Sequence, residues 1–260
     1  MRIDQLLVQR GLAGTRSQAQ RLIADGVRWR LLGDEWHRVG KNGDDVSPDA
    51  DIELLDDAQA RYVSRGGLKL AGALAHCGLS VANALCLDLG QSTGGFTDCL
   101  LQAGARHVVG VDVGRGQLDQ RLRGDARVAC LEQINARNLT VDDVLPGLPG
   151  AEREDAFDGF DLIVGDLAFI SQTLVLPAAV TLLKPGGFVL MLVKPQFELQ
   201  PGQVGKGGIV TDHSLYAVVE KRIRAAHQAL GLRVADYFPS SIQGGDGNQE
   251  FFIHSTRAQE

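Results

Sequence analysis

The chain has 260 residues, of which 44% are hydrophobic, so it can bury the core of one medium domain with a small appendage. No apolar run approaches the roughly 20 residues that a membrane-spanning helix needs, and the N-terminus lacks the apolar stretch of a signal peptide. We therefore expect a soluble, cytoplasmic protein without a membrane partner. The net charge of −6 argues against a protein that coats nucleic acid without specificity.

Charge changes sign within the first sixty residues. Residues 1–41 carry eight Lys/Arg and four Asp/Glu, whereas residues 42–60 carry seven acids and no base. A basic face on the N-terminal part is therefore compatible with an acidic chain. The cysteines lie far apart, without a CxxC pair or clustered histidines, and we expect buried, reduced thiols and no metal site at Cys77, Cys86, Cys99 and Cys130.

The first sixty residues predict a small helix-helix-strand module. Apolar residues at helical spacing, followed by Gly11, predict a helix over residues 2–10. Thr15 and Gln18 have the spacing of a capping box and Gly26 suits a helix end, which predicts a second helix between them. Short strands are expected after it, at 27–32 and 51–55, with turns at 33–34 and 42–43.

The segment RIDQLLVQRGLAGTRSQAQRLIADGVRW resembles the small RNA-binding domain of ribosomal protein S-four, which also occurs in several RNA-modifying enzymes. The resemblance implies that the second helix and the turn after it face RNA, through Arg10, Arg16, Gln20, Arg21 and Arg28. It departs from that domain at residues 29–36, where a Val-Asn-Gly turn is usual. The alternative is that these side chains form an ordinary solvated surface.

From residue 60 onward, hydrophobic runs alternate with helical stretches, which is the pattern of an α/β fold. Strands are expected at 84–89, 107–112, 127–131, 161–165, 187–193, 233–238 and 250–254. Helices are expected near 66–77, 96–104, 172–183 and 213–230. Seven strands at this spacing predict a doubly wound, Rossmann-like sheet with helices on both faces. We place it in a catalytic domain of residues 61–260, after an α+β RNA-binding domain of residues 1–60.

Residues 86–98 predict a strand, a glycine-rich turn and a helix, which together suit a nucleotide-like ligand. The spacing of these glycines differs from the GxGxxG of dinucleotide enzymes, and suits a cofactor without a pyrophosphate, such as S-adenosylmethionine. Asp112 ends the next strand, where a carboxylate can accept both hydroxyls of a ribose. The expected cofactor contacts are Asp88, Gly90, Ser92, Thr93, Gly94, Gly95, Phe96, Asp112, Glu132, Asn135 and Asp166. An NAD-type dehydrogenase is the alternative.

Four charged residues point to the reaction type. Asp166 and Lys194 end the fourth and fifth strands, at the edge of an open α/β sheet where ligands bind. If the last strand is antiparallel, Glu250 reaches the same edge, and Lys69 can reach it from the helix before the first strand. A ribose hydroxyl is a poor nucleophile, and a lysine beside a second lysine can accept its proton. Ordinary surface ion pairs are the alternative.

Six segments together resemble the TlyA (hemolysin A) family of ribosomal RNA 2′-O-methyltransferases over nearly the whole chain: 62–74, 92–97, 111–114, 166–171, 193–198 and 204–208. The resemblance implies a catalytic tetrad of Lys69, Asp166, Lys194 and Glu250. It also implies S-adenosylmethionine as cofactor, ribosomal RNA or ribosomal subunits as partner, and a cytidine ribose as target. The sequence departs from the family at Gln91, Ala168 and Arg115, where alanine, serine and often an aromatic residue are usual.

Three other functions stay open. Methylation of an exocyclic amine usually requires an Asn/Asp-Pro-Pro-aromatic run after strand four, where this sequence has Asp166-Leu-Ala-Phe. Methylation of a pyrimidine carbon needs a nucleophilic cysteine, and none stands after a strand beside a proline. A pore-forming cytolysin would need a long amphipathic membrane element, which is absent from the sequence. An RNA-binding assembly factor without catalysis is the third, and the oligomeric state is left open.

Overall fold

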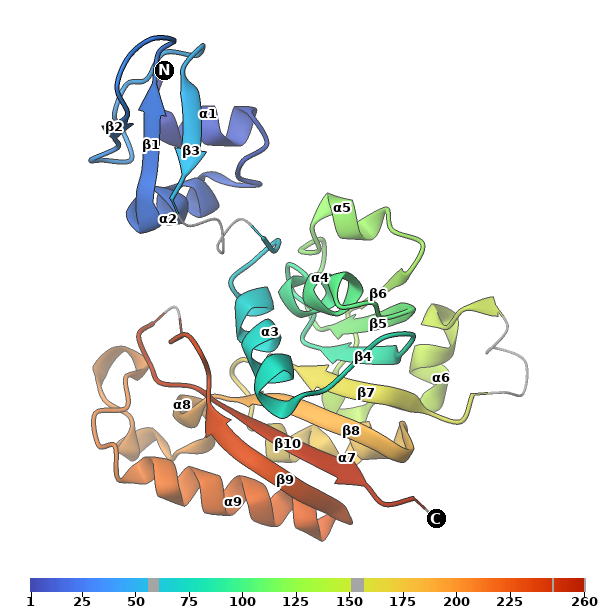
Figure 1. Ribbon diagram of the computed structural model, residues 1–260. Helices are drawn as coiled ribbons and strands as arrows, with labels where there is room; N and C mark the ends of the chain where they lie inside the picture. Colours follow the sequence, from blue (N-terminus) through green and yellow to red (C-terminus); the bar gives the residue numbers. More distant parts are fainter. Residues whose placement is uncertain (56–60, 151–156, 245, 260) are drawn as a thin grey trace. The chain divides into compact units, whose positions relative to one another are not determined.

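The computed structural model describes residues 1–55, 61–150, 157–244 and 246–259, and it divides into two compact units, Met1–Leu68 and Lys69–Glu260 (Figure 1). The division falls inside helix α3 (Gly66–Cys77). The domain boundary predicted after residue 60 lies at the edge of the segment 56–60, outside the described residues. Over the described part of the chain, no helix has both the length and the apolar character needed to cross a membrane.

The first unit has two helices and a small antiparallel sheet. Its elements are α1 (Ile3–Gln9), α2 (Arg16–Gly26), β1 (Val27–Arg30), β2 (His37–Arg38) and β3 (Asp51–Leu54), with strand order β2-β1-β3. The two predicted helices and two predicted strands are confirmed, and β2 is an additional short strand. The helices and strands enclose an apolar core of their own, which includes Ile3, Leu6, Leu7, Ala19, Leu22, Val27 and Val46.

Helix α2 begins and ends where the sequence predicts, with one change in the cap. The Thr15 side chain accepts a hydrogen bond from the Gln18 backbone N–H at 3.1 Å, as in a capping box. The Gln18 side chain accepts from the N–H of Gly14 at 2.7 Å, one residue before the expected partner. Gly26 has φ +131°, and a Cβ there would lie 3.2 Å from the Leu55 side chain, so a larger residue would strain this helix end.

The second unit alternates strands and helices in chain order. After α3 come β4 (Leu85–Leu89), α4 (Gly95–Gln102), β5 (His107–Asp112), α5 (Gln120–Arg123), β6 (Val128–Glu132), α6 (Val141–Val144), β7 (Phe160–Gly165), α7 (Leu176–Thr181), β8 (Leu183–Val193), α8 (Pro195–Glu198), α9 (Leu215–Ala229), β9 (Leu232–Pro239) and β10 (Phe251–Arg257). The sheet order is β6-β5-β4-β7-β8-β10-β9. In this sheet β10 is antiparallel to both β8 and β9, and the four described pairings among β4 to β8 are parallel. All seven predicted strands are confirmed.

Helices cover both faces of this sheet, as the sequence predicts. Alternate strand residues such as Leu87 and Val109 pack into one core with apolar residues of α6, α7 and α9. On the other face, Phe96 of α4 stacks on Phe252 of β10, with 6.2 Å between ring centroids. Figure 1 shows α3 and α4 on one side of the sheet and α7 and α9 on the other. The carboxyl ends of five parallel strands are thereby left at one edge.

Two predicted boundaries differ from the structure. The helix expected over 172–183 is a 3-10 turn, Gln172–Leu174, followed by α7, because Pro177 near the start of α7 has no N–H to continue a preceding helix. Strand β8 begins at Leu183, which pairs with Phe160, and its register then shifts before Phe188 pairs with Leu162. Helices α5, α6 and α8 are single turns of four residues, too short to show a helical period in the sequence.

Candidate active site

Three of the four predicted tetrad residues lie side by side because their strands are neighbours. Asp166 follows β7, Lys194 follows β8, and Glu250 precedes β10, which lies next to β8 in the sheet. Phe251 of β10 pairs with Val193 of β8, so the start of β10 lies at the carboxyl end of β8. The antiparallel direction expected for the last strand is therefore confirmed.

The four side chains form two ion pairs that differ in burial. Lys69, in the first turn of α3, places its Nζ 2.5 Å from Oε2 of Glu250, and these side chains are 9% and 3% exposed. The Nζ of Lys194 lies 2.5 Å from Oδ1 of Asp166, and these side chains are 14% and 23% exposed. Lys69 and Glu250 thus form the inner pair, and Lys194 and Asp166 form the pair that is more open to solvent.

The two pairs also interact electrostatically. Burial raises the pKa of the Glu250 carboxyl, while the positive charges of Lys69 and Lys194 oppose the rise and the negative charge of Asp166 adds to it. Lys194 therefore interacts electrostatically with the carboxylates of both Asp166 and Glu250. A change in the charge of Lys69, Lys194 or Asp166 would thus alter the proton affinity of Glu250.

A buried carboxylate that the sequence analysis missed ties the segment after β7 to the segment after β8. Glu198, at the end of α8, is 4% exposed, and its carboxylate accepts hydrogen bonds from the Ser171 hydroxyl at 2.5 Å and the Gln172 N–H at 2.8 Å. Burial raises the pKa of Glu198, and these two hydrogen bonds partly oppose the rise. The chain that follows Asp166 and the chain that follows Lys194 are thus held together.

An exposed aromatic side chain lies on the same segment. Phe169, three residues after Asp166, is 91% exposed, and its φ of +63° is unusual for an aromatic residue. Its ring lies 5.2 Å from that of Phe197, three residues after Lys194. The two rings thus join the segments that follow Asp166 and Lys194, and the exposed face of Phe169 could stack on a flat ligand. The phenylalanine is visible in the sequence, but its exposure is not.

The glycine-rich turn after β4 adjoins the tetrad. Gly90 has φ +79°, and a Cβ there would lie 2.9 Å from the backbone oxygen of Asp166. Asp112, at the end of β5, accepts hydrogen bonds from the backbone N–H groups of Ser92 at 2.7 Å and Gly114 at 2.6 Å. A half-buried carboxylate with further acceptor positions suits the ribose hydroxyls of S-adenosylmethionine, and a bare glycine backbone suits close approach of the cofactor.

Other residues expected at the cofactor have structural partners. Asp88 is fully buried and accepts from the Thr97 hydroxyl at 2.7 Å, and the Phe96 ring lies in the core on Phe252. A Cβ on Gly94 would collide with the Leu122 side chain, so glycine at this position allows α5 to pack closely against the turn. Any contact of these three residues with a cofactor would therefore be made through the backbone. Gly95 is also buried, at the first position of α4.

The remaining expected contacts lie on the outer part of the turn and strands. Glu132 pairs with Arg123 at 2.6 Å and accepts from the Gly116 N–H at 2.8 Å. Asn135 is exposed and caps a 3-10 turn by accepting from the N–H of residue 137. Thr93 is exposed, and its backbone oxygen accepts a hydrogen bond from Asp119 at 3.2 Å. The side chain of Glu132 is already committed to the protein, whereas those of Asn135 and Thr93 remain accessible.

Beneath the turn lies a small buried polar network. The Gln91 side chain, 3% exposed, donates to the Thr97 hydroxyl at 3.0 Å, and that hydroxyl donates to Asp88. Gln91 fills the space over Gly110, where a Cβ would collide with it. Burial raises the pKa of Asp88 to about 7. Gln91, where an alanine is usual in the family, thus packs beneath the turn and supports it through the Thr97 hydrogen bond.

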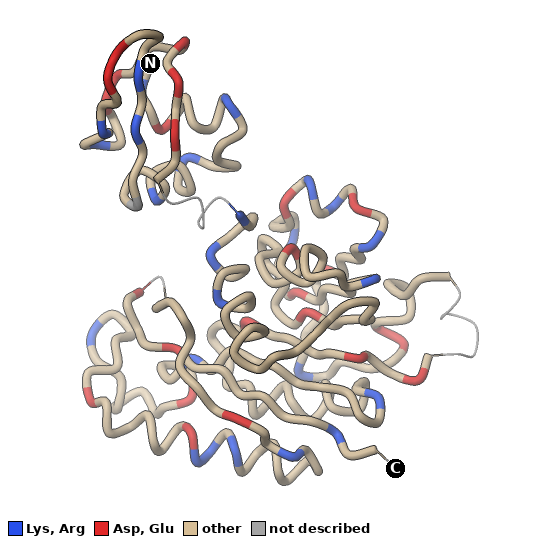
Figure 2. Tube along the Cα trace, viewed as in Figure 1, with Lys and Arg blue, Asp and Glu red and all other residues tan. Residues whose placement is uncertain are grey.

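In the first unit, most of the basic residues expected to face RNA are bonded to the protein itself. Arg10 donates to the Ala50 carbonyl at 2.6 Å, Arg16 pairs with the buried Asp4 at 2.9 Å, and Arg28 pairs with Glu53 at 2.6 Å. Figure 2 shows the basic strand β1 beside the acidic strand β3, so the acidic stretch neutralises much of the basic one. Gln20 is exposed and Arg21 is half-buried.

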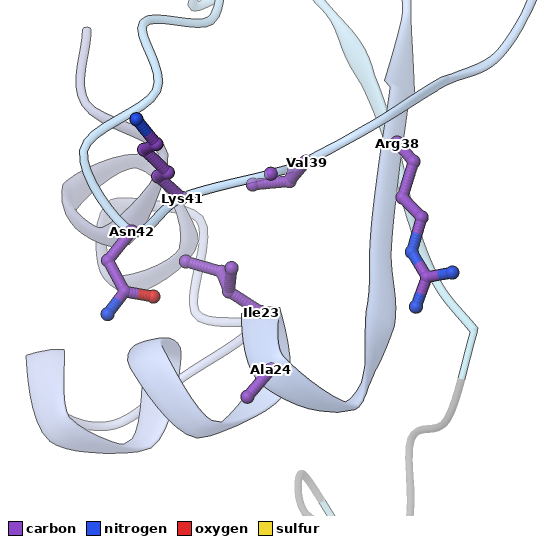
Figure 3. Close-up of a pocket in the computed structure, with 7 residues that line it drawn as sticks. Ile23, Ala24, Arg38, Val39, Lys41 and Asn42 are labelled. Carbon is purple, nitrogen blue, oxygen red and sulfur yellow. The ribbon is translucent and has the colours of Figure 1, made fainter.

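Two cations of this unit that the sequence analysis did not select line a hollow of about 630 Å³. Arg38 lies on one side of it and Lys41 and Asn42 lie on the other, with Ile23 and Ala24 of α2 between them (Figure 3). In the described part of the chain, neither Arg38 nor Lys41 has an acidic partner within 4.0 Å. The hollow combines positive charge with an apolar floor, and both suit a nucleotide.

Comparison with known proteins adds family relationships to this geometry. A family model described as FtsJ-like methyltransferase matches residues 62–257, and one described as S4 domain matches residues 1–26. The 16S/23S rRNA (cytidine-2′-O)-methyltransferase TlyA of Mycobacterium tuberculosis is 42% identical, over 97% of this chain and 88% of that protein. Hemolysin A of Brachyspira hyodysenteriae is 35% identical, over 98% and 99%. A solved structure from Streptococcus thermophilus, described as a candidate hemolysin, matches with TM-score 0.73 and 40% identity, over 99% and 88%.

Proposed function

The chain belongs to the TlyA family of FtsJ-like methyltransferases, and we propose that it methylates the 2′-hydroxyl of a cytidine ribose in ribosomal RNA. It is an S-adenosylmethionine-dependent methyltransferase, as its family is. The observation that carries the ribose chemistry is the pair of lysine–carboxylate contacts at the sheet edge beside the Gly90 turn. An enzyme with this substrate would work where ribosomes are, in the cytoplasm.

The residues around the turn fit the cofactor. S-adenosylmethionine, when bound, supplies a methyl group activated by the positive sulfur. Asp112 would hold the adenosine ribose through its carboxylate, and the backbone at Gly90 would allow the cofactor to approach Asp166. Both features lie at the carboxyl edge of the sheet, beside the tetrad.

We assign different roles to the two pairs. Lys194, in the more accessible pair, would accept the proton of the ribose hydroxyl when its own amine is neutral, and Asp166 would fix its position. Lys69 and Glu250, in the buried pair, would keep the local charge balanced and help to hold Lys194 in place, because Glu250 also interacts with the charge of Lys194. The exposed Phe169 ring would support the base of the target nucleotide.

The cysteines disfavour the rival chemistry at a pyrimidine carbon. Cys86 and Cys99 are buried, and Cys77 and Cys130 are half-buried. Burial raises the pKa of Cys77 to about 11, and it raises the pKa of Cys86 and Cys130 as well. A cysteine nucleophile reacts as the thiolate, which these environments suppress.

Nucleoside mass spectrometry combined with alkaline hydrolysis tests the proposal. A 2′-O-methyl group blocks cleavage at the modified nucleotide, whereas a methyl group on the base does not. We expect wild-type enzyme to produce a protected cytidine, and Lys194→Ala to lower the rate by about 10²–10⁴ while cofactor binding stays nearly unchanged. Replacement of all four cysteines by alanine is the control and should leave activity within a small factor. A methylated base, or an active Lys194→Ala variant, would show that the ribose mechanism is wrong.

A further inference from the structure

The connection between α8 and α9 contains a glycine-rich loop, residues 205–208, to which the mechanism above gives no role. Gly207 and Gly208 have φ of +76° and +82°, a pair of successive left-handed residues. A Cβ on either would meet nothing within 4 Å, so these glycines are required by the backbone path and not by crowding. The loop therefore exposes its main chain to open space.

This loop is anchored to the segment that precedes Glu250. Asn248, which is 2% exposed, donates from Nδ2 to the Gly208 carbonyl at 2.8 Å and accepts at Oδ1 from the Val210 N–H at 2.9 Å. Asn248 lies two residues before Glu250. The Gly205 N–H closes the loop on the Ile209 carbonyl at 2.8 Å. These hydrogen bonds fix the path of the loop and hold it next to the segment that leads to Glu250.

Several hydrogen-bond donors of the loop are unused. Lys206 is exposed, and among the described residues it has no ion-pair partner. The backbone N–H groups of Lys206 and Gly207 likewise donate no hydrogen bond within the described part of the chain. The nearby acids are occupied, because Asp246 accepts from Gln196 and Asn248, and Asp212 accepts from Ser214. Successive free N–H groups with a lysine form a site for an anion.

We propose that the 205–208 loop binds a phosphate of the RNA backbone next to the target nucleotide, through the Lys206 ammonium and the N–H groups of Lys206 and Gly207. The proposal rests on the function proposed above, since only a nucleic-acid substrate brings a backbone phosphate to the tetrad. The geometry would position the target ribose, because Asn248 links the loop to Glu250 at a fixed distance along the chain. Lys206 is then a substrate-binding residue and takes no part in proton transfer.

The test compares full-length wild type, Lys206→Ala and Lys221→Ala with ribosomal RNA between about 50 and 200 mM salt. Lys221 is an exposed lysine of α9, and its substitution removes the same charge elsewhere in the same unit. We expect Lys206→Ala to raise the KM for RNA about tenfold at low salt and to lower the salt slope of log affinity by about one. kcat and the Kd for S-adenosylmethionine should stay near wild type. Lys221→Ala should change none of these.

A second variant separates the backbone donors from the charge. Gly207→Ala keeps Lys206 but disfavours φ +76°, so we expect the KM for RNA to rise while the salt slope stays near that of wild type. An unchanged KM for Lys206→Ala, or equal losses for Lys206→Ala and Lys221→Ala, would overturn the proposal. A loss of cofactor affinity would instead assign the loop to the cofactor. If wild type binds RNA through Lys206 but makes no 2′-O-methyl product, the proposed function fails and the phosphate site stands.

Free phosphate is the other source of such an anion. Inorganic phosphate should compete with RNA for wild type only weakly, because a single contact without the rest of the nucleotide supplies little binding energy. Strong competition in wild type that disappears in Lys206→Ala would show that the loop is a site for free phosphate, and would overturn its assignment to the RNA backbone.

Discussion

Asp88 shows how one buried residue can make the enzyme sensitive to pH. Its carboxylate accepts from Thr97, but its Oδ1 and the Oε1 of Gln91 in the same network have no hydrogen-bond partner within the described residues. A proton on Asp88 supplies a donor to this network and removes a buried charge. Burial, the main cause, therefore holds the pKa of Asp88 at about 7, against a usual value of 3.8.

We expect Asp88→Asn to remove part of the pH dependence of stability. Between pH 3.8 and about 7 the folded wild type holds more protons at Asp88 than the unfolded chain, so its stability falls as the pH rises, by at most about 1.4 kcal/mol per pH unit. Asparagine resembles the neutral acid. Urea unfolding should then find the variant close to wild type near pH 4 and more stable than wild type at pH 8.

Asp142→Asn, at an exposed position of α6, is the control for this experiment and should follow wild type at both values. If the free energy of unfolding depends on pH in the same way for wild type and Asp88→Asn, Asp88 is already charged between pH 4 and pH 8. That result would show that protonation of Asp88 does not control the stability of the network beneath the turn.

For single residues, the sequence was sufficient to select the four charged residues of the tetrad but not the side chains that surround them. Asp166 and Lys194 could be selected because they end strands of clear hydrophobic pattern, and their convergence with Glu250 required only the direction of the last strand. Their catalytic roles remain predictions. Glu198 and Phe169 could not be selected, because one is important through burial and the other through exposure, and both depend on tertiary packing.

At the scale of elements, the small sheet of the first unit determines which cations are available for RNA. Arg28 and Arg30 of β1 face Glu53 and Asp51 of β3 in register, and their charges are paired. Both guanidinium groups also lie within 4.8 Å of the Trp36 ring centroid. The segment 29–36, which departs from related RNA-binding domains in sequence, therefore covers the arginines of β1.

The consequence is a prediction about RNA affinity. Arg38→Ala combined with Lys41→Ala should weaken binding of ribosomal RNA and lower the salt slope by about two, because each of the two cations would neutralise one phosphate. Arg28→Ala should leave the slope nearly unchanged, because its charge is already paired with Glu53. Its effect on stability should be at most about 1 kcal/mol, since the pair is exposed. Filter binding over a salt series measures the salt slope of each variant. A larger loss of affinity for Arg28→Ala than for the double variant would support the RNA-facing surface that the sequence predicts.

Most strands and the longer helices were predictable, and the four-residue helices were not. The period of apolar residues is clear over α9 and over the strands of the larger sheet. A four-residue helix such as α8 has a single turn, with Pro195 at its start and the hydrogen bonds of Glu198 at its end. Such elements depend on contacts between distant segments, which a local pattern does not contain.

At the scale of the whole molecule, the two units have separate hydrophobic cores. One core lies within residues 3–54, and the other is built on the larger sheet. We propose that the first unit supplies most of the RNA affinity and the second supplies the chemistry. A fragment of residues 61–260 should therefore bind S-adenosylmethionine with nearly the affinity of the full chain.

The same fragment should lose most methylation of ribosomal RNA, and the loss should grow with salt if phosphate contacts dominate. Calorimetry measures the first property and incorporation of labelled methyl groups measures the second. Full methylation by the fragment would show that the first unit is dispensable for substrate recognition.

The position of β10 also affects the order in which this enzyme can form. β10 follows β9 in the chain but lies between β8 and β9 in the sheet, so β9 has no sheet neighbour until β10 is inserted. Glu250 arrives with that insertion. A folding intermediate with β4 to β8 in place can already form the Gly90 turn, yet its inner lysine has no carboxylate partner. Cofactor binding and catalytic competence should therefore appear as two separate kinetic phases during refolding, and simultaneous recovery of both would contradict this order.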